Sequence, residues 1–405
     1  MTQFGLDALA AGKGDALVLR WGTDEQSHLA LIDGGPSTVW ANAIQPHLHD
    51  LAGTNPAGQP NPVVLELVVV SHVDDDHIAG IIDLANAIDS AQKQASPVPA
   101  TVGEVWHNAF ADMEFLADFA DEPNLQQAIK DADATPKSLH VDSAVPRDDP
   151  TIGDITAGAQ SVAQGRQLDR VLKTINVNRN TSFSDRGHFV REGAGLNIEG
   201  LHINVMAPNT QLLDRLKTEW KKELRKILKK EADKKKAGVR ALAAAFDDPS
   251  IPNQSSIVLL VEFIGKKMLL TGDVRGDQLI DALQNSPAIT TMPLKVDLFK
   301  VPHHGSAHSN GRKLFEAVTA DHYVISGNGE HGNPHPDTLR ALFETQAGRP
   351  ITLSLTNRPT AGAVRPADVK KAKAAQKVLD EAQSDPNLTI IYRGDGDLAV
   401  TVDLT

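Results

Sequence analysis

The sequence predicts an α/β fold in which two mixed β-sheets pack face to face, with helices on their outer faces. Strand-like runs, rich in β-branched residues and leucine, follow one another along most of the chain, and helical patterns separate only some of them. A doubly wound parallel sheet would instead alternate strands and helices regularly. The chain has 405 residues, and we expect a single domain over residues 1–405.

Each expected strand is a short apolar run that ends at glycine or at polar residues. We expect strands over residues 15–22, 28–35, 62–72, 101–110, 201–209, 255–265, 266–274, 296–306, 321–327 and 351–357. The sequence Ile-Gly-Lys-Lys at residues 264–267 indicates a turn that joins two of these strands in a hairpin. An Asp-Gly turn predicts another hairpin within residues 388–404.

The helices are predicted from apolar residues that recur at helical spacing. We expect helices over residues 78–94, 277–285, 311–318 and 333–344. Residues 113–195 are polar and prone to form helix, which predicts a helical insertion between elements of the sheets. Residues 214–245 are expected to form a charged helix, since eleven Lys or Arg stand against five Asp or Glu between residues 214 and 236.

The charged helix has two interpretations. Clustered cations gain free energy from counterion release when they bind nucleic acid. A solvated helix stabilised by Glu–Lys pairs, such as Glu219 with Lys222, is the more frequent case for a run of this kind. The sequence leaves both interpretations open.

The composition excludes several classes of function. The formal net charge is −12, so any contact with a polyanion has to be local. The chain has no cysteine, which excludes disulfides, thiolate zinc sites and cysteine nucleophiles. The N-terminal residues lack a signal-peptide pattern, and no apolar run approaches the ~20 residues that span a bilayer. We therefore expect a cytoplasmic protein without a membrane segment.

A cluster of His and Asp follows the apolar run at residues 62–70. His72 and His77 flank three adjacent carboxylates, Asp74, Asp75 and Asp76, which repel one another unless a positive charge lies between them. A divalent cation would remove this repulsion, and mixed imidazole and carboxylate ligands suit Zn²⁺, Mn²⁺ or Fe better than Ca²⁺. The alternative is a solvated turn in which Asp caps the following helix.

Other predicted strands also end in residues that can bind a metal. His107 follows one strand, Asp273 another, and the pair His303 and His304 a third. One histidine at a strand end is more often structural, but several such ends favour a shared metal site.

The stretch SHVDDDHIAG at residues 71–80 resembles the His-x-His-x-Asp-His signature of the metallo-β-lactamase fold, with Asp74 at the position of the second His. This version resembles the hydrolase domain of ComEC-type DNA-uptake competence proteins. Further segments are similar to that group, namely AAGKGDALVLRWG, LIDGG, LLTGDV, DLFKVPHHGSAHS and SGNGEHGNPHP. The resemblance covers roughly residues 1–110 and 200–405.

The resemblance implies an αββα sandwich that binds two divalent metal ions, Zn²⁺ or Mn²⁺. The implied ligands of one ion are His72, Asp74 and His107, and those of the other are Asp76, His77 and His304, with Asp273 bridging the two. Strand alternation leaves open which of His303 and His304 is the ligand, and His304 is favoured. Because Asp74 replaces an imidazole, the metal preference moves toward Mn²⁺.

The resemblance also implies how such a site would act. A water bridging two metals becomes a hydroxide nucleophile near neutral pH. Asp76 would orient this water, and His303 would contact the substrate. His335 would donate a proton to the leaving oxygen or bind a phosphate. The alternative role of His335 is to cap the helix that begins beside Pro336.

These features predict a metal-dependent phosphodiesterase or nuclease that acts on nucleic acid or a nucleotide. One alternative is a hydrolase of a small ester, lactone or phosphocholine-type substrate, which the acidic net charge suits slightly better. The other is a non-catalytic binding or regulatory module of the same fold. The sequence leaves the oligomeric state open.

Overall fold

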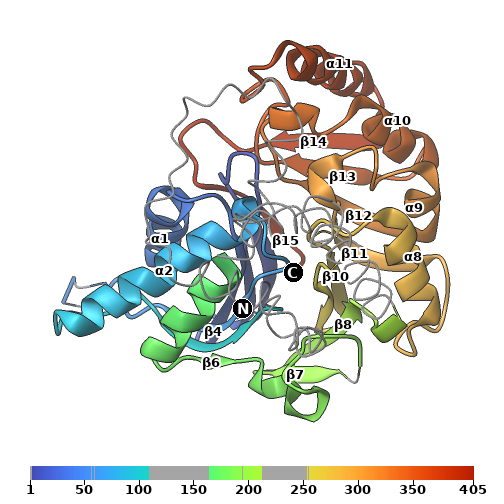
Figure 1. Ribbon diagram of the computed structural model, residues 1–405. Coiled ribbons are helices and arrows are strands. Elements are labelled where there is room, and N and C mark those ends of the chain that lie inside the picture. The colour runs from blue at the N-terminus through green and yellow to red at the C-terminus, as the bar shows by residue number, and fades with distance from the viewer. Residues whose placement is uncertain are drawn as a thin grey trace, which may run out of the picture.

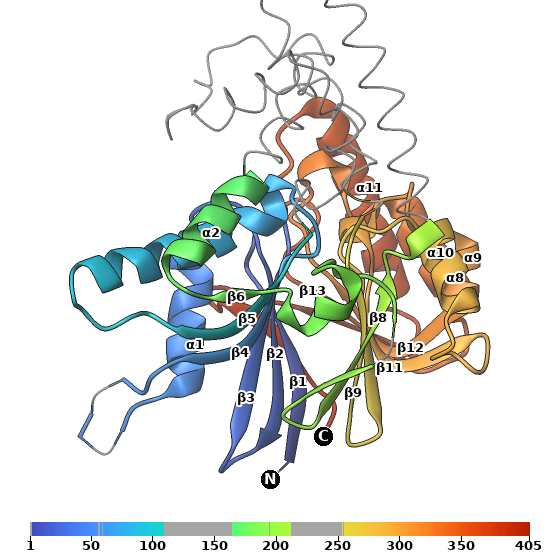
Figure 2. The ribbon, with the colours of Figure 1, turned by 60° about the horizontal axis from the view of Figure 1, so that its bottom comes forward.

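Two β-sheets pack face to face, and helices cover both outer faces, as the computed structural model in Figure 1 shows. The structure describes residues 2–55, 57–58, 60–108, 164–193, 195–211, 253 and 255–405. Seen from a second direction, the two sheets lie on opposite sides of a shared interior (Figure 2). The predicted α/β sandwich of two mixed sheets with outer helices is therefore confirmed.

The first sheet combines an antiparallel half with a parallel half. Its strands, in spatial order, are β15 (Ala399–Asp403), β1 (Thr2–Leu9), β2 (Ala16–Thr23), β3 (Ser27–Gly34), β4 (Val64–Val69), β5 (Thr101–Trp106) and β6 (Asn178–Arg179). Neighbours from β15 to β3 are antiparallel, and neighbours from β3 to β6 are parallel.

The second sheet has the same mixed character. Its strands, in spatial order, are β14 (Leu388–Tyr392), β13 (Ile351–Leu355), β12 (Val318–Ile325), β11 (Leu294–Lys300), β10 (Lys266–Leu270), β9 (Val258–Phe263), β8 (Leu201–Ala207) and β7 (Leu196–Ile198). Neighbours from β14 to β10 are parallel, and neighbours from β10 to β7 are antiparallel.

The helices divide between the two sheets. On the first sheet lie α1 (Gln45–Ala52) and α2 (Asp75–Lys93), and on the second lie α8 (Gly276–Asn285), α9 (Arg312–Ala317), α10 (Pro336–Thr345) and α11 (Pro366–Ala382) (Figure 1). The shorter helices are η1 (Trp40–Ile44), η4 (Thr181–Arg186), η5 (His303–Gly305) and η6 (Glu330–Gly332). Across the described residues, no helix combines the length and the apolar character needed to cross a membrane.

Three apolar clusters hold these four layers together. The central one lies between the sheets and includes Trp21 and Trp106 of the first sheet and Met268 and Leu298 of the second. The other two fill the spaces between each sheet and its helices. Burial of this apolar surface is the main favourable term in folding. The central cluster, which draws side chains from both sheets, holds the sheets together.

The two hairpin predictions have opposite outcomes. The turn at Ile264 and Gly265 joins β9 to β10 as an antiparallel pair, which confirms the first. The predicted hairpin over residues 388–404 is wrong, since β14 pairs with β13 in the second sheet and β15 pairs with β1 in the first. Val400 and Val402 of β15 are buried in the cluster between the sheets. Long-range burial therefore outweighs the local turn signal.

Two predicted segments lie largely outside the described residues. The expected charged helix at 214–245 is one, and the larger part of the expected insertion at 113–195 is the other. In the described part of that insertion, the helical residues 164–174 pack on the first sheet through Leu168 and Leu172, and β6 adds a strand to that sheet.

Candidate metal centre

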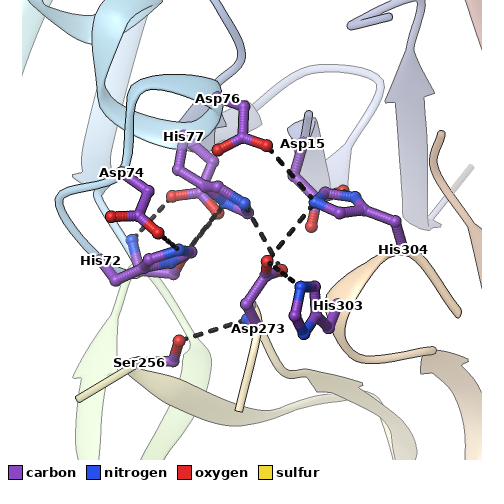
Figure 3. Close-up of polar contacts among 12 residues, drawn as sticks. Asp15, His72, Asp74, Asp76, His77, Ser256, Asp273, His303 and His304 are labelled. Atoms are coloured by element: carbon purple, nitrogen blue, oxygen red, sulfur yellow. Dashed lines mark hydrogen bonds and ion pairs between the residues drawn. The ribbon is translucent and has the colours of Figure 1, made fainter. Parts of the chain in front are cut away.

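Most of the predicted ligands meet at one edge of the sandwich, where strands of both sheets end. The loop after β4 carries His72 and leads into α2, whereas Asp273 follows β10 and His304 follows β11 (Figure 3). β4, β10 and β11 belong to the parallel parts of their sheets. The carboxyl ends of parallel strands are a frequent place for a functional site in α/β proteins.

The first turn of α2 positions Asp76 and His77. The helix begins at Asp75, so helical geometry rather than strand alternation directs these two side chains. Asp74 is the N-cap residue, but its side chain makes no capping hydrogen bond. Its Oδ2 instead lies 3.5 Å from Nε2 of His72. The structure therefore disfavours a simple helix cap as the reason for this carboxylate.

Three imidazole rings and one carboxylate form the centre of the cluster. The ring centroids of His72 and His77 are 4.1 Å apart, and those of His77 and His304 are 5.4 Å apart. The Oδ1 atom of Asp273 is 3.4 Å from Nε2 of His77, and its Oδ2 is 3.5 Å from Nε2 of His304. Oδ2 of Asp76 lies 3.8 Å from the same His304 nitrogen.

These distances produce overlapping groups of potential metal ligands. Among the described residues, the groups whose ligand atoms all lie within 4.8 Å of one another are His72–His77–Asp273, Asp76–His77–His304, Asp15–Asp33–His77 and Asp15–Asp273–His304. Most of these side chains are buried, and only Asp76 is partly exposed. The first two groups share His77, and Asp273 belongs to the first of them (Figure 3).

Several buried polar atoms in this cluster make no hydrogen bond within the described residues. Those toward the centre are Nε2 of His72, Nε2 of His77, Nε2 of His304 and Oδ1 of Asp273, and behind them Nδ1 of His304 and both carboxylate oxygens of Asp15 also make none. A buried polar atom without a partner costs about 1–3 kcal/mol. A divalent cation would satisfy the atoms toward the centre together, because imidazole nitrogen and carboxylate oxygen are both ligands of Zn²⁺ and Mn²⁺. The residues therefore fit a metal site.

The remaining ring nitrogens of His77 and His72 are held away from the cluster. Nδ1 of His77 lies 2.8 Å from Oδ2 of Asp33, and Nδ1 of His72 lies 3.1 Å from Oγ of Ser71. Ser71 also donates to Asp33 from both its hydroxyl and its backbone N–H, each at 2.7 Å. Metal-binding histidines usually donate their other N–H in this way, which fixes the ring and its tautomer.

The buried carboxylates and imidazoles shift one another's pKa values. Burial disfavours the charged form of His77, but Asp273 and Asp33 outweigh it and raise the pKa of His77 well above 6.5. Burial likewise opposes charge on His304, yet Asp273 and Asp15 raise its pKa to about 10. Burial raises the pKa of Asp273, and the facing His304 and His77 reverse this and hold it well below 3.8. The ionised carboxylates therefore stabilise a positive charge at the centre of the cluster.

His303 differs from its neighbour His304 in its surroundings. Its side chain is 30% exposed, its Nδ1 lies 3.2 Å from Oγ of Ser309, and its Nε2 lies 3.7 Å from Oδ2 of Asp273. His304 belongs to two of the ligand groups and His303 to none. Burial lowers the pKa of His303, so a neutral imidazole faces Asp273 from the more open side.

The backbone at these two histidines is strained. His303 has φ +49° and His304 has φ +51°, in the left-handed region that L-residues rarely adopt. Such a conformation costs roughly 1–2 kcal/mol per residue. Strain of this kind concentrates at functional sites, where the surrounding structure holds it.

His335 caps a helix and faces the same loop. Its Nδ1 accepts a hydrogen bond from the backbone N–H of Asp337 at 3.2 Å, which makes it the N-cap residue of α10. Its own backbone N–H donates to the carbonyl of Gly305 at 2.9 Å. Because Nδ1 accepts, the proton of the neutral ring is on Nε2, which remains a donor. The cap predicted as the alternative is therefore present, and it leaves Nε2 available for a substrate.

His107 pairs with a carboxylate through Nε2, while its buried Nδ1 makes no hydrogen bond within the described residues. It is buried at the end of β5, its Nε2 lies 2.9 Å from Oδ1 of Asp169, and Arg179 donates to the same oxygen at 2.9 Å. It belongs to none of the ligand groups found among the described residues, and neither does Asp74, which instead lies against His72.

Three further residues contribute to the site although no role was predicted for them. Ser71 orients His72 and Asp33, and Asp15 lies behind His304, where it pairs with the buried Lys300. One signal for Lys300 was available, since a single lysine interrupts the apolar end of the run VDLFKVP. A buried lysine needs a carboxylate partner, which the sequence alone does not identify.

Comparisons with known proteins give one partial sequence match and several distant structural matches, of which two are described below. No protein-family model matches the sequence. A stretch of 97 residues is 33% identical to ComE operon protein 3 of Bacillus subtilis (strain 168). The match covers 24% of this chain and only 12% of that much longer protein.

Both structural matches extend over nearly the whole chain. A "Putative metal-dependent hydrolase" from Parabacteroides distasonis ATCC 8503 aligns over 97% of this chain and 99% of its own, with 10% identity and a TM-score of 0.32. A protein of unknown function from Enterococcus faecalis V583 aligns over 96% and 87%, with 8% identity and a TM-score of 0.28. These TM-scores are too low to support an argument about fold or function. The metallo-β-lactamase resemblance therefore stays a prediction, accompanied by one partial sequence match.

Proposed function

We propose that this protein is a hydrolase that uses two divalent metal ions, Zn²⁺ or Mn²⁺, to cleave phosphodiesters in nucleic acid or nucleotides. One observation carries the proposal. Buried Nε2 atoms of three histidines and a buried oxygen of Asp273 converge without hydrogen-bond partners in the described structure. The second nitrogens of these histidines lie against Asp33, Ser71 and Asp15, as in proteins whose histidines bind metal.

The proposed ligands divide into two sets around Asp273. His72 and Asp74 would hold one ion, and Asp76, His77 and His304 would hold the other. His107 would complete the first set through its Nδ1, which is buried without a hydrogen-bond partner among the described residues, while Asp169 holds its Nε2. When bound, such ions supply Lewis acidity toward a phosphoryl oxygen and lower the pKa of a water to about 7. No nucleophilic side chain is required, in keeping with the absence of cysteine.

Three side chains would complete the chemistry. Asp76, which is partly exposed, would accept a hydrogen bond from the attacking water and so orient it. His303 would contact the substrate as a neutral ring from the open side of Asp273. His335 would donate its Nε2 proton to the leaving oxygen, because its Nδ1 is held by the N-terminus of α10.

Cationic side chains beside the site favour an anionic substrate. Burial, Arg365 and Lys13 lower the pKa of His331, and Nη2 of Arg365 lies 2.8 Å from Nδ1 of that ring. Lys13 precedes Gly14, whose backbone packs so closely on Asp76 that an added Cβ would lie 2.0 Å from the Asp76 carbonyl oxygen. Arg365 also pairs with Asp368, and in a chain with net charge −12 Lys13 and Arg365 would favour a phosphate over a neutral ester.

The test combines metal analysis with cleavage assays on the full-length protein. We expect bound Zn²⁺ or Mn²⁺, and cleavage of single-stranded nucleic acid or bis(p-nitrophenyl) phosphate that a chelator abolishes. Asp273→Asn should lower kcat for phosphodiester cleavage at least a hundredfold. A matched control is Asp297→Asn, since Asp297 pairs with Lys266 outside the cluster.

Other outcomes would favour the alternatives. Cleavage of phosphodiesters that survives Asp273→Asn would refute the metal mechanism. Turnover of a lactone or neutral ester without turnover of any phosphodiester would favour the small-substrate hydrolase. Bound metal without turnover of either class would favour a binding module.

A further inference from the structure

A buried ion pair joins the two sheets directly behind the candidate metal centre. Asp15 immediately precedes β2 of the first sheet, and Lys300 is the last residue of β11 in the second. Nζ of Lys300 lies 2.8 Å from Oδ2 of Asp15, and both residues have an exposed fraction of 0%. Nζ also donates to the carbonyl of Val301 at 3.1 Å.

Asp15 contacts both sides of the centre. Its second carboxylate oxygen, Oδ1, lies 3.3 Å from Nδ1 of His304 (Figure 3). Its backbone N–H donates to the carbonyl of Asp76 at 3.2 Å. Gly14 permits this approach, because any Cβ at that position would collide with the Asp76 backbone. Asp15 therefore connects the loop of His304 with the first turn of α2.

We propose that Asp15 is a positioning residue that holds His304 as a metal ligand, and that Lys300 makes the buried carboxylate of Asp15 tolerable by neutralising it. This inference rests on the proposed metal-dependent function. Oδ1 of Asp15 lies 3.3 Å from Nδ1 of His304 and would attract the proton there, which leaves Nε2, the nitrogen that faces Asp273 and Asp76, for a metal. Asp33 stands in the same relation to His77, at 2.8 Å.

The strained backbone of His304 explains why such an anchor is needed. Its φ of +51° places the residue in a conformation that its own backbone does not favour. Such a conformation persists only where contacts with the surrounding structure hold it. Asp15 supplies one such contact from the opposite sheet, so the geometry of the site depends on how the two sheets are packed.

A purely structural ion pair is the competing explanation. Replacing both partners of a buried pair by apolar residues of similar size is often neutral for folding, whereas removing one partner leaves an unpaired buried charge. The double variant Asp15→Leu/Lys300→Met is therefore the decisive one, because it removes both charges together. Asp15→Asn/Lys300→Met is its conservative counterpart, since the amide oxygen of Asn can still accept the His304 proton.

The experiment measures binding of Mn²⁺ and Zn²⁺ to chelator-treated full-length protein by titration calorimetry, with thermal unfolding as a check on folding. We expect Asp15→Leu/Lys300→Met to bind one of the two ions about ten- to a hundredfold more weakly. The variant with Asn should recover part of this loss. A folded Leu/Met variant with wild-type affinity for both ions would overturn the inference, and so would an Asn variant that is no better than the Leu variant.

A control variant and a spectroscopic measurement remove the remaining ambiguities. Asp7→Leu/Arg20→Met removes another buried pair of the first sheet, which joins β1 to β2 at 2.8 Å, and should leave metal affinity unchanged. An equal loss in this control would overturn the inference.

If the Leu/Met variant does not fold, ¹⁵N-histidine NMR of the Zn²⁺-loaded wild type provides the test instead. Protonated Nδ1 of His304 supports the inference, and unprotonated Nδ1 overturns it. A wild type that binds no divalent ion would instead refute the proposed function itself.

Discussion

Metal binding to this protein should release protons and strengthen steeply as the pH rises. Asp273 and Asp15 raise the pKa of His304 to about 10 despite its burial, and Asp273 and Asp33 raise the pKa of His77 well above 6.5. At pH 7 both rings are therefore protonated in the metal-free protein. A metal requires an unprotonated Nε2, so each ring has to lose one proton on binding.

The magnitude follows from the shift at His304. The pKa of His304, about 10, lies three units above pH 7. Removing this proton at pH 7 costs about 4 kcal/mol, so the apparent metal affinity is about a thousandfold weaker than that of a site whose imidazole is already unprotonated. Each unit of increasing pH should raise the affinity about tenfold for each proton displaced, hence about a hundredfold when His77 contributes as well. The sign is fixed, because protons and metal compete for the same nitrogens.

Titration of chelator-treated protein with Mn²⁺ between pH 6 and pH 8 measures this dependence. Repeating the titration in buffers of different ionisation enthalpy counts the protons released. His28→Gln is a matched control, since His28 contacts Glu66 at 2.9 Å outside the cluster. Metal affinity that stays constant with pH, without proton release, would refute the assignment of His77 and His304 as ligands.

Three further predictions concern stability and substrate. In metal-free protein the raised pKa values of His77 and His304 stabilise the fold fully below about pH 6.5, and the contribution of His304 is lost as the pH rises through about 10. Thermal unfolding should show a Tm that falls above pH 6.5 only without metal, and an unchanged Tm would contradict it. Asp33→Asn should weaken binding of the ion held by His77 about ten- to a hundredfold, because Asn no longer holds Nδ1–H as an anion does; wild-type affinity in calorimetry would argue against this role. Lys13→Ala/Arg365→Ala should raise KM for a polynucleotide severalfold and change that for bis(p-nitrophenyl) phosphate less; equal changes for both substrates would reject a cationic rim that contacts the longer anion.

Much of the architecture was predictable because its signals are local. Apolar runs of strand length predicted most of the strands, and the turn at Ile264 and Gly265 joined the expected pair. β1 was not predicted, since Gly5 and Asp7 interrupt its apolar pattern. In the structure Asp7 is buried against Arg20, and Arg20 also pairs with Asp403 of β15 across Gly5. The glycine and the aspartate in β1 are therefore explained only by the pairing of β15, β1 and β2 in one sheet.

The sequence by itself determined which residues have the chemistry for a metal site. His72, Asp76, His77 and Asp273 were identifiable because imidazole and carboxylate side chains cluster where apolar strands end. Their gathering at one edge follows from the parallel strands that precede several of them, whose carboxyl ends share a side of the sheet.

Only the tertiary structure decided how these residues are arranged. It placed His304 rather than His303 in the ligand groups, paired His107 with Asp169, and brought Asp15 against Lys300. The physical reason is the same in each case. These contacts depend on residues far apart in the chain, and the packing of the apolar core fixes their positions. No local pattern in the sequence identifies any one pair.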